Sequence, residues 1–437
     1  MVMPTVLSAT RVAAPPVQRP DPGAHSPGAY EGPGAAARGS AASSVLTAGV
    51  GVLVLGADLP LPHSTSTGLV VVLVLLPVWI YVLPRYSGAR ALLALALAAL
   101  LSGLDLTWTA GPGRSIDLRH VAELSTLLVT AFGGVGLLLW ARTHLSLPAV
   151  AALYAAGKLL VALAQVPGSP NAWKFQLAFP TTVLVLAAVA RTRSRTWTVL
   201  SLVALGLVGV SHQYRSFVAF CVVAAALSLF GARRGRRYGA LSRRVQVLIL
   251  LGALSASAYF LGSAALVDGY AGKVLQQRSV EQITRSGSLL VGGRPEWSAT
   301  IRLMREQPGG FGVGVVPRAD DVWTGRGGLA AAGLPPDPVR DRYMFDGQFR
   351  LHSVLADLWV NCGAVGIALG VLIAGLLLNG LSVALVRRRA SALVGFLVVI
   401  SLWDLVFGPI HTNLADVALA LGLVLRPWGG AISRSRE

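Results

Sequence analysis

Charged residues are scarce in this chain of 437 residues, at 13% of the sequence, whereas hydrophobic residues make up 54% and the mean hydropathy is +0.65. Soluble domains carry about twice that share of charges, roughly 25%. The composition therefore excludes an ordinary soluble protein and predicts an all-α polytopic membrane protein.

Cysteine is nearly absent as well. The two cysteines, Cys221 and Cys362, both lie inside apolar stretches. This excludes a disulfide framework and a cysteine-ligated metal site, and we predict neither a metal nor another cofactor. No short apolar core follows a basic start, so no signal peptide is expected.

Acidic residues are few, with 19 Asp and Glu against 37 Lys and Arg, and the formal net charge of +18 is carried almost wholly by arginine. In a soluble protein this excess would suggest nucleic acid. Here the arginines form short clusters between apolar runs, as they do in cytoplasmic loops. The lipid bilayer, and no nucleic acid, is therefore the expected partner.

Apolar runs of roughly 17 to 25 residues, the length that crosses about 30 Å of hydrocarbon, predict about twelve transmembrane helices. They lie near 44–60, 67–84, 89–107, 120–141, 147–167, 173–190, 196–212, 215–231, 245–266, 363–386, 391–410 and 413–427. Arginines gather on every second connection, at 85–90, 142, 191–195, 233–244 and 387–389. This alternation places both termini in the cytoplasm of a protein of the plasma membrane.

The predicted organisation has five parts. Residues 1–43, rich in Pro, Ala, Gly and Ser, are expected to form a disordered cytoplasmic tail, and 44–266 hold the first nine helices. Residues 267–350 form one large extracytoplasmic loop, 351–427 hold the last three helices, and 428–437 form a cytoplasmic tail. A long loop of this kind usually carries function.

Two stretches on the predicted outer side concentrate charge. The hairpin "SHQYRSF", residues 211–217, places Arg215 at the start of a helix, and "GRPEWSATIRLMREQPGGFGVGV", residues 293–315, places Arg294 before an amphipathic segment. Arginine is disfavoured on a short outer turn unless an anion needs it, although it can also snorkel to the headgroups. The apolar residues Trp297, Ile301 and Met304 are expected to lay one helical face on the membrane surface.

A third stretch, "LHSVLADLWVNCGAVG", residues 351–366, places His352 directly before a membrane span. With Arg294 followed by Trp297, and with "QPGGFGVG", it resembles the O-antigen ligase and O-antigen polymerase superfamily. In that family the last motif is typically a His-Asn pair, with an acid nine positions after the histidine and glycines at eleven and fourteen. Gly363 and Gly366 lie eleven and fourteen positions after His352 and match the two glycines of the motif. Ser353 stands in place of the asparagine and Asn361 in place of the acid, whose role is open or has passed to Asp357.

The resemblance implies a GT-C-like, inverting, metal-independent glycosyltransferase, acting as polymerase or ligase on the outer face of the membrane. Its expected partners are a polyprenyl-diphosphate-linked oligosaccharide as donor and a glycan as acceptor. Arg215 and Arg294 would bind the diphosphate, since a guanidinium grips phosphate oxygens bidentately. His352 would be the general base, since imidazole titrates near neutral pH. The supporting candidates are His212, Tyr214, Trp297, Asp357 and Asn361.

Alternatives remain at this stage. His352 could instead be one of several histidines at the headgroup level, with His63, His120, His212 and His411. Asp357 lies about 140° around a helix from His352 and is expected to make a buried polar contact.

Lys158, inside the fifth predicted span, and Asp404, inside the eleventh, are further intramembrane charges. They mark function, and helix packing or a mutual ion pair is the competing account. The alternative function is a transporter or flippase of lipid-linked glycans. The lack of a repeat between the two halves and the large outer loop stand against it.

Overall fold

The computed structural model describes residues 33–111, 113–192, 194–230, 273–286, 294–386 and 391–428, with the single positions 245, 249 and 252. The chain divides into two units, Met1–Ser43 and Ser44–Glu437. The predicted span at 245–266 lies almost entirely outside the described residues, as do residues 1–32 of the predicted tail and nearly all of the tail at 428–437.

Helices make up nearly all of the secondary structure in these ranges. The two strands, each of two residues, form one antiparallel pair. In chain order the elements are α1 (Pro33–Ala57), β1 (Pro60–Leu61), β2 (Thr65–Ser66), α2 (Thr67–Val74), α3 (Leu76–Trp79), η1 (Ile80–Arg85), α4 (Ala89–Thr109), α5 (Leu118–His144), α6 (Leu147–Gln165), η2 (Val166–Gly168), η3 (Trp173–Leu177), α7 (Ala178–Thr192), α8 (Arg195–Ser211), α9 (Arg215–Phe230), α11 (Lys273–Ser286), α13 (Glu296–Glu306), α14 (Ala319–Ala331), α15 (Pro338–Phe345), α16 (Val354–Val386), α17 (Ala392–Phe407) and α18 (Ile410–Val424).

Several helices have the length and apolar composition of membrane spans. Among the described residues there are five, Ala89–Thr109, Leu118–His144, Leu147–Gly168, Trp173–Thr192 and Val354–Val386, and a bent pair, α2 with α3 and η1, would make a sixth. The apolar helices Ala42–Ala57, α8, α9, α17 and α18 coincide with other predicted spans but are shorter. The protein is thus an all-α membrane protein, while the total of twelve spans stays a prediction.

The first helix starts before the predicted boundary at residue 43. Helix α1 begins at Pro33, inside the stretch that was expected to be a disordered tail ending at residue 43. Alanine is frequent in "PGAAARGSAAS", and its high helix propensity extends the apolar helix toward the N-terminus.

The second predicted span, 67–84, is broken rather than continuous. α2 and the α3–η1 segment meet at an angle of 54°. Pro77 stands at the first turn of α3 and has no N–H to donate into the preceding turn. The Trp79 indole N–H donates to the Val72 carbonyl at 2.8 Å, which satisfies one of the backbone groups near the break.

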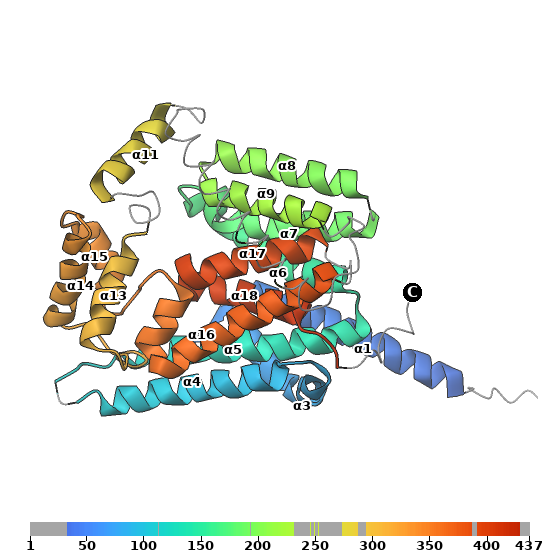
Figure 1. Ribbon diagram of the computed structural model, residues 1–437. Coiled ribbons are helices and arrows are strands. Elements are labelled where there is room, and N and C mark those ends of the chain that lie inside the picture. The colour runs from blue at the N-terminus through green and yellow to red at the C-terminus, as the bar shows by residue number, and fades with distance from the viewer. Residues whose placement is uncertain are drawn as a thin grey trace, which may run out of the picture. The chain divides into compact units, whose positions relative to one another are not determined.

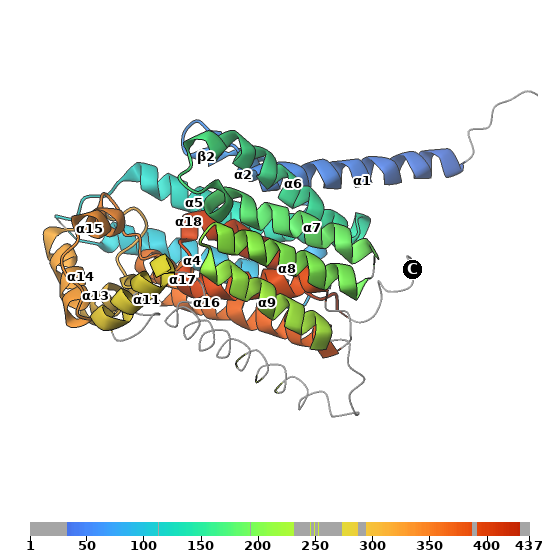
Figure 2. The same cartoon turned by 90° about the horizontal axis from the view of Figure 1, so that it is seen from above.

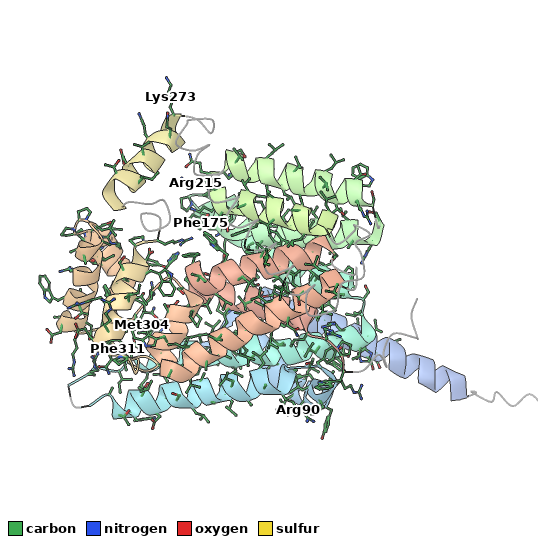
Figure 3. All side chains as sticks on the ribbon, viewed as in Figure 1. Arg90, Phe175, Arg215, Lys273, Met304 and Phe311 are labelled. Carbon is green, nitrogen blue, oxygen red and sulfur yellow. The ribbon has the colours of Figure 1, made fainter. Side chains whose placement is uncertain are left out.

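A central bundle carries the longest helices. α16 packs along α4 and α17, and α18 packs along α5, while α7 and α9 contact α17 from the other side (Figures 1 and 2). At one end of this bundle Arg142 donates to the carbonyls of Gly422 and Leu425, and Ser87 N donates to Arg426 O. Arginines of the first two predicted cytoplasmic connections therefore lie at this end, and Arg90 and Phe311 mark opposite ends of α4 (Figure 3).

The segment predicted as a large loop contains helices α11, α13, α14 and α15. α13 packs against α14 and α14 against α15, and the three lie together in Figure 1. Two ion pairs fix this arrangement, Arg326 with Asp341 and Arg114 with Asp321, both at 2.8 Å. Because Arg114 follows α4, the second pair joins the loop helices to the bundle.

The glycine-rich stretch after α13 threads between three long helices. Gly310, Gly312 and Gly314 all have positive φ, at 83°, 112° and 73°. A Cβ on Gly312 would lie 2.6 Å from the Thr107 amide of α4, and one on Gly310 would lie 2.5 Å from the Trp359 carbonyl of α16. Glycine is required here both by the left-handed backbone and by the close approach.

Candidate functional site

Arg215 begins α9 directly after a tight hairpin. Gln213 has a φ of +56°, and the Tyr214 amide donates to the Gly209 carbonyl at 2.8 Å, which turns the chain sharply. The Tyr214 ring stacks on Phe217 with centroids 5.3 Å apart. His212 caps α8, and its carbonyl accepts from the Asn171 amide at 2.8 Å. His212 and Tyr214 therefore shape the turn that presents the exposed Arg215 side chain.

Arg294 lies directly before α13 and faces two aromatic rings of α17. Its guanidinium carbon is 6.0 Å from the Trp403 ring centroid and 5.9 Å from that of Phe407. The Trp297 indole donates to the Val406 carbonyl at 2.7 Å. Trp297 thus links α13 to α17, while Ile301 is exposed. The expected contact of this helical face with the membrane surface stays a prediction. A guanidinium group that lies over aromatic rings can still donate hydrogen bonds from the N–H groups at its edge.

His352 occupies a strained backbone position. Its φ of +56° is unusual for a residue with a side chain, and such outliers gather at functional sites. The hydroxyl of the next residue, Ser353, donates to the Leu405 carbonyl of α17 at 3.0 Å. The Tyr343 hydroxyl lies 2.5 Å from His352 Nδ1, and the two rings are 5.3 Å apart. Tyr343 therefore positions the imidazole and leaves Nε2 for other contacts.

The electrostatics around His352 favour the neutral imidazole. Burial, followed by repulsion from Arg294 and Lys174, lowers its pKa to about 4. The Tyr343 hydroxyl keeps its proton, because burial first and then Asp357 and Glu296 raise its pKa to about 12. A neutral imidazole is the form that accepts a proton.

Lys174 is a third cation of this site that the sequence interpretation missed. It lies in η3, a π-helical turn, close enough to Arg215 and Arg294 for their charges to repel its own. Its backbone N–H donates to Asn171 Oδ1 at 3.0 Å. Since Asn171 also bonds the His212 carbonyl, one side chain ties the Lys174 turn to the Arg215 hairpin. Short π-helical turns are frequent at functional sites.

The surroundings of Lys174 are aromatic and open. Its ammonium lies 5.1 Å from the centroid of the exposed Phe175 ring, and Trp173 stacks near His212 at 6.0 Å. Figure 3 shows Phe175 and Arg215 near each other at the end of the bundle opposite Arg90. The structure thus brings Lys174, Arg294 and His352 into one electrostatic neighbourhood, with Arg215 beside Lys174.

Glu296 is a second residue that was missed. Burial raises the pKa of this carboxyl, with Arg294 and Arg340 acting in the opposite direction. It also influences the Tyr343 hydroxyl. An acid two residues after Arg294 was visible in the sequence, but its approach to Tyr343 depends on the packing of α13 against the segment before α16.

Asp357 has a structural role. Its two carboxylate oxygens accept from Leu351 N at 2.8 Å and from Ile410 N at 3.0 Å, so it holds the residue before His352 and the first residue of α18. The expected buried polar contact is confirmed. Asn361, at the position of the family acid, donates to the Asp357 carbonyl at 2.8 Å and lines a separate cavity with His411.

The motif glycines also have a structural explanation. Gly363 breaks the helical path of α16 with φ 63° and ψ −147°. A Cβ there would lie 2.5 Å from the Gly309 carbonyl, so the kink accommodates the glycine-rich stretch. Beyond this break a Cβ on Gly366 would meet the Leu358 carbonyl at 2.0 Å.

The intramembrane charges pair differently from the expectation. Lys158 forms an ion pair with Asp416 of α18, and not with Asp404. Tyr154 also bonds Asp416, while Asp404 bonds Asn413. α18 was predicted as a short apolar span, and its Asp416 was not considered as a partner.

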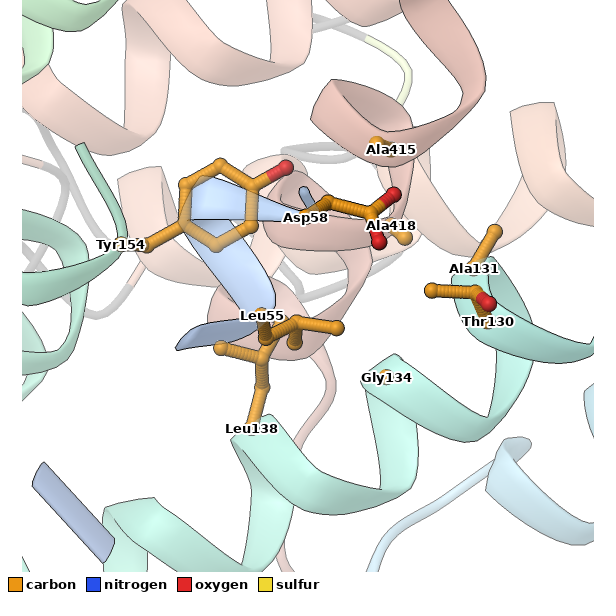
Figure 4. Close-up of a pocket in the computed structure, with 9 residues that line it drawn as sticks. All are labelled: Leu55, Asp58, Thr130, Ala131, Gly134, Leu138, Tyr154, Ala415 and Ala418. Atoms are coloured by element: carbon orange, nitrogen blue, oxygen red, sulfur yellow. The ribbon is translucent and has the colours of Figure 1, made fainter. Parts of the chain in front are cut away.

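A small cavity lies beside this pair. Figure 4 shows Tyr154, Asp58 and Thr130 among the residues that line it. Asp58 accepts from Gly68 N at 3.1 Å, and the Thr130 hydroxyl has no hydrogen-bond partner. The cavity and the ion pair form a polar centre inside the bundle.

No protein-family model, curated protein or solved structure matches the chain. The likeness to the O-antigen ligases and polymerases therefore rests on the motifs alone. Within the described ranges, no three His, Cys, Asp or Glu side chains gather as a metal site would require.

Proposed function

We propose that the chain is a membrane glycosyltransferase, a polysaccharide polymerase or ligase that uses a polyprenyl-diphosphate-linked glycan. The observation that carries the proposal is the gathering of Arg215, Lys174 and Arg294 from three segments, of which Lys174 and Arg294 also lower the pKa of His352 after its burial. Like charges repel, so their gathering costs free energy that a bound polyanion would offset. A diphosphate has the charge and the oxygen geometry that guanidinium groups bind bidentately.

The aromatic rings suit the rest of such a donor. Phe175 is 63% exposed beside Lys174, and Trp403 and Phe407 lie under Arg294. Apolar rings next to cations would receive the first isoprene units of the carrier, while the sugar extends away from the membrane. The site would then lie at the outer boundary of the bilayer, as the alternation of arginine-rich connections predicts.

In the proposed reaction the acceptor hydroxyl oxygen attacks the anomeric carbon of the donor glycan. His352 Nε2 takes the hydroxyl proton, and the bond from the anomeric carbon to the diphosphate oxygen breaks with its electron pair leaving on the diphosphate. A single displacement inverts the anomeric configuration. The three cations stabilise the negative charge that develops on the leaving group, which is the contribution a preorganised electrostatic site makes to catalysis.

Tyr343 and Glu296 would act through the imidazole and Arg294. When the Nδ1–H donates to the Tyr343 oxygen, Nε2 carries the free lone pair that the base needs. The carboxyl of Glu296 lies near enough to Arg294 and Tyr343 for their charges to influence one another.

The experiment compares donor use by matched variants of the cationic cluster. Arg294→Lys keeps the charge but loses the planar fork, and Lys174→Gln loses one charge. Both should raise the Michaelis constant for a purified polyprenyl-diphosphate oligosaccharide by about 10-fold or more, since charge-assisted hydrogen bonds contribute about 1.5–3 kcal/mol each. Arg305→Lys, on the exposed part of α13, is the control. Wild-type donor constants in both cluster variants would refute the diphosphate site.

A transporter or flippase of lipid-linked glycans is the second candidate. It is favoured by the Lys158–Asp416 pair with Tyr154 and the adjoining cavity, because intramembrane ionisable groups often mark transport pathways. Such a protein would move the donor without changing its covalent structure.

A further inference from the structure

The small cavity of Figure 4 lies where α1, α5, α6 and α18 meet. Its lining includes Leu55 of α1, Asp58 directly after α1, Thr130 of α5, Tyr154 of α6 and Ala415 of α18. The interior measures about 10 Å³, which is room for one water molecule or one bare monovalent ion. The cavity is therefore too small for an organic ligand, and its chemistry is set by the oxygen atoms around it.

Thr130 has a hydroxyl without a hydrogen-bond partner, although the residue is only 4% exposed. The other buried threonines among the described residues are Thr107, Thr182 and Thr300. Each of these donates to the carbonyl oxygen four residues earlier in its helix. Because an unpaired buried hydroxyl costs free energy, the exception at Thr130 indicates a water molecule or an ion in contact with it.

Two carboxylates and one cation lie at this cavity. Lys158 forms an ion pair with Asp416, which also accepts a hydrogen bond from Tyr154. Asp58 accepts from Gly68 N at 3.1 Å with one oxygen, and like Asp416 it interacts electrostatically with Tyr154. With both carboxylates ionised, two negative charges face one positive charge. A second cation would balance the excess in this poorly solvated place.

Close backbone contacts bring these groups together. A Cβ on Gly68 would lie 2.4 Å from an Asp58 carboxylate oxygen and 2.8 Å from the Thr130 methyl, so both side chains approach one point. A Cβ on Gly157 of α6 would lie 2.0 Å from the Leu53 carbonyl, so α1 lies directly against α6. The oxygen atoms around the cavity are thus held by rigid elements, as a binding site requires.

The end of α1 adds partial negative charge. The Asp58 N–H closes the last turn on the Val54 carbonyl at 2.9 Å. The next N–H, that of Leu59, donates to the Thr67 hydroxyl at 2.9 Å instead of continuing the helix to the Leu55 carbonyl. The last carbonyls of a helix have no backbone donor within it and carry its negative dipole end. Carbonyls of this kind coordinate sodium in membrane proteins.

We propose that this cavity binds one sodium ion, an inference that does not depend on the proposed function. The second carboxylate oxygen of Asp58, the hydroxyls of Thr130 and Tyr154 and the carbonyls at the end of α1 supply its ligands. One carboxylate with neutral oxygens suits a monovalent ion, whereas a divalent ion requires more oxygen ligands or bound water than this cavity can hold. The ion links α1 to α5 and α6 and stabilises their packing.

The test measures the binding of radioactive sodium to the purified full-length protein in detergent, with choline chloride keeping the ionic strength constant. The wild type should bind one ion per chain, and the binding should saturate. Thr130→Val removes the unpaired hydroxyl at nearly constant volume, and Asp58→Asn removes the charge while keeping an oxygen for the Gly68 N–H. Each should weaken sodium binding about 10-fold or more, the loss expected for one contact to a charged group.

Two variants elsewhere in the bundle are matched controls. Thr182→Val removes a buried hydroxyl that is already bonded to a carbonyl of its own helix. Asp105→Asn removes an exposed carboxylate of α4. Both proteins should bind sodium as the wild type does.

Thermal unfolding provides a second readout. Replacing choline by sodium should raise the unfolding temperature of the wild type and both controls, because a ligand that binds only the folded state stabilises it. The rise should be lost in Thr130→Val and Asp58→Asn, whose transitions in choline chloride verify that they fold. A folded wild type without saturable sodium binding would show that the cavity holds only water and would overturn the site. Wild-type sodium affinity in both folded cavity variants would place the ion elsewhere and overturn it as well.

Discussion

His352 combines a left-handed backbone, a hydrogen bond to Tyr343 and two neighbouring cations. Its φ of +56° changes how its role should be tested. Alanine at this φ carries backbone strain, whereas asparagine adopts left-handed conformations readily. An alanine variant would therefore confuse a lost base with a disturbed backbone.

The prediction for this residue concerns His352→Asn. Glycan transfer should fall by roughly 10² to 10⁴, the usual contribution of a general base. Expression and the unfolding temperature should stay near those of the wild type, because asparagine adopts the left-handed backbone conformation of this position without much strain. The rate of glycan transfer at saturating substrates is the measurement. Wild-type rates in a folded His352→Asn protein would remove His352 from the mechanism.

The pH dependence follows from the lowered pKa of His352. The base must be neutral, so kcat/KM should be level from about pH 5 to 8 and should fall only as the pH drops through about 4. Burial is the main cause of the lowered pKa, and repulsion from Arg294 and Lys174 adds to it. An acidic limb with an apparent pKa near 6.5, the ordinary value, would contradict a buried imidazole beside cations.

Some residues of the candidate site could be predicted from the sequence and others could not. His352, Arg294 and Arg215 were found because each belongs to a motif or is unusual in its place. Lys174 was not found, because its relation to both arginines arises from the packing of η3 against the hairpin before α9. Asp357 could be placed on the far side of the helix from His352, but its bond to Ile410 required the position of α18.

Among the secondary-structure elements, α16 contains a kink at Gly363 that makes room for the glycine-rich stretch. The ψ of −147° with positive φ is accessible essentially to glycine alone. Gly363→Ala should destabilise the protein by at least about 1–3 kcal/mol, since it adds strain and a clash with the Gly309 carbonyl. Thermal unfolding in detergent would measure it.

Gly375 supplies the matched control on the same helix. A Cβ there meets no atom within 4 Å, so Gly375→Ala should be neutral or slightly stabilising. Equal unfolding temperatures for the two variants would show that the kink is not required.

The pairing of α6 with α18 gives a second prediction at this scale. Lys158 and Asp416 have 27% and 9% side-chain exposure, so removing one partner leaves a poorly solvated charge. Lys158→Met should destabilise the protein by about 3–5 kcal/mol, and Lys158→Met with Asp416→Leu should recover part of the loss. A double variant no more stable than Lys158→Met would contradict the pair. The same cycle with Lys158 and Asp404 should show little coupling.

At the scale of the whole molecule, the hydropathy of the sequence predicted the positions of several helices of the bundle. The predicted spans at 89–107, 120–141 and 147–167 coincide with α4, α5 and α6, because long apolar runs have few alternatives to membrane helices. The span predicted from 363 begins earlier, at Val354, since the apolar helix resumes across the kink. Segments that thread between helices, such as the stretch around Gly312, carry no hydropathy signal.

If the protein is a glycosyltransferase, it changes the covalent structure of the donor. Purified protein in nanodiscs receives a tritium-labelled polyprenyl-diphosphate oligosaccharide, the glycan fraction of the host cell envelope as acceptor, no nucleotide and excess chelator. We expect labelled glycan of larger size, with the anomeric configuration inverted, and free polyprenyl diphosphate in equal amount. A regular ladder of products indicates a polymerase, and a single transfer indicates a ligase. Recovery of the intact donor, with or without movement across the bilayer, would contradict the glycosyltransferase and favour the transporter.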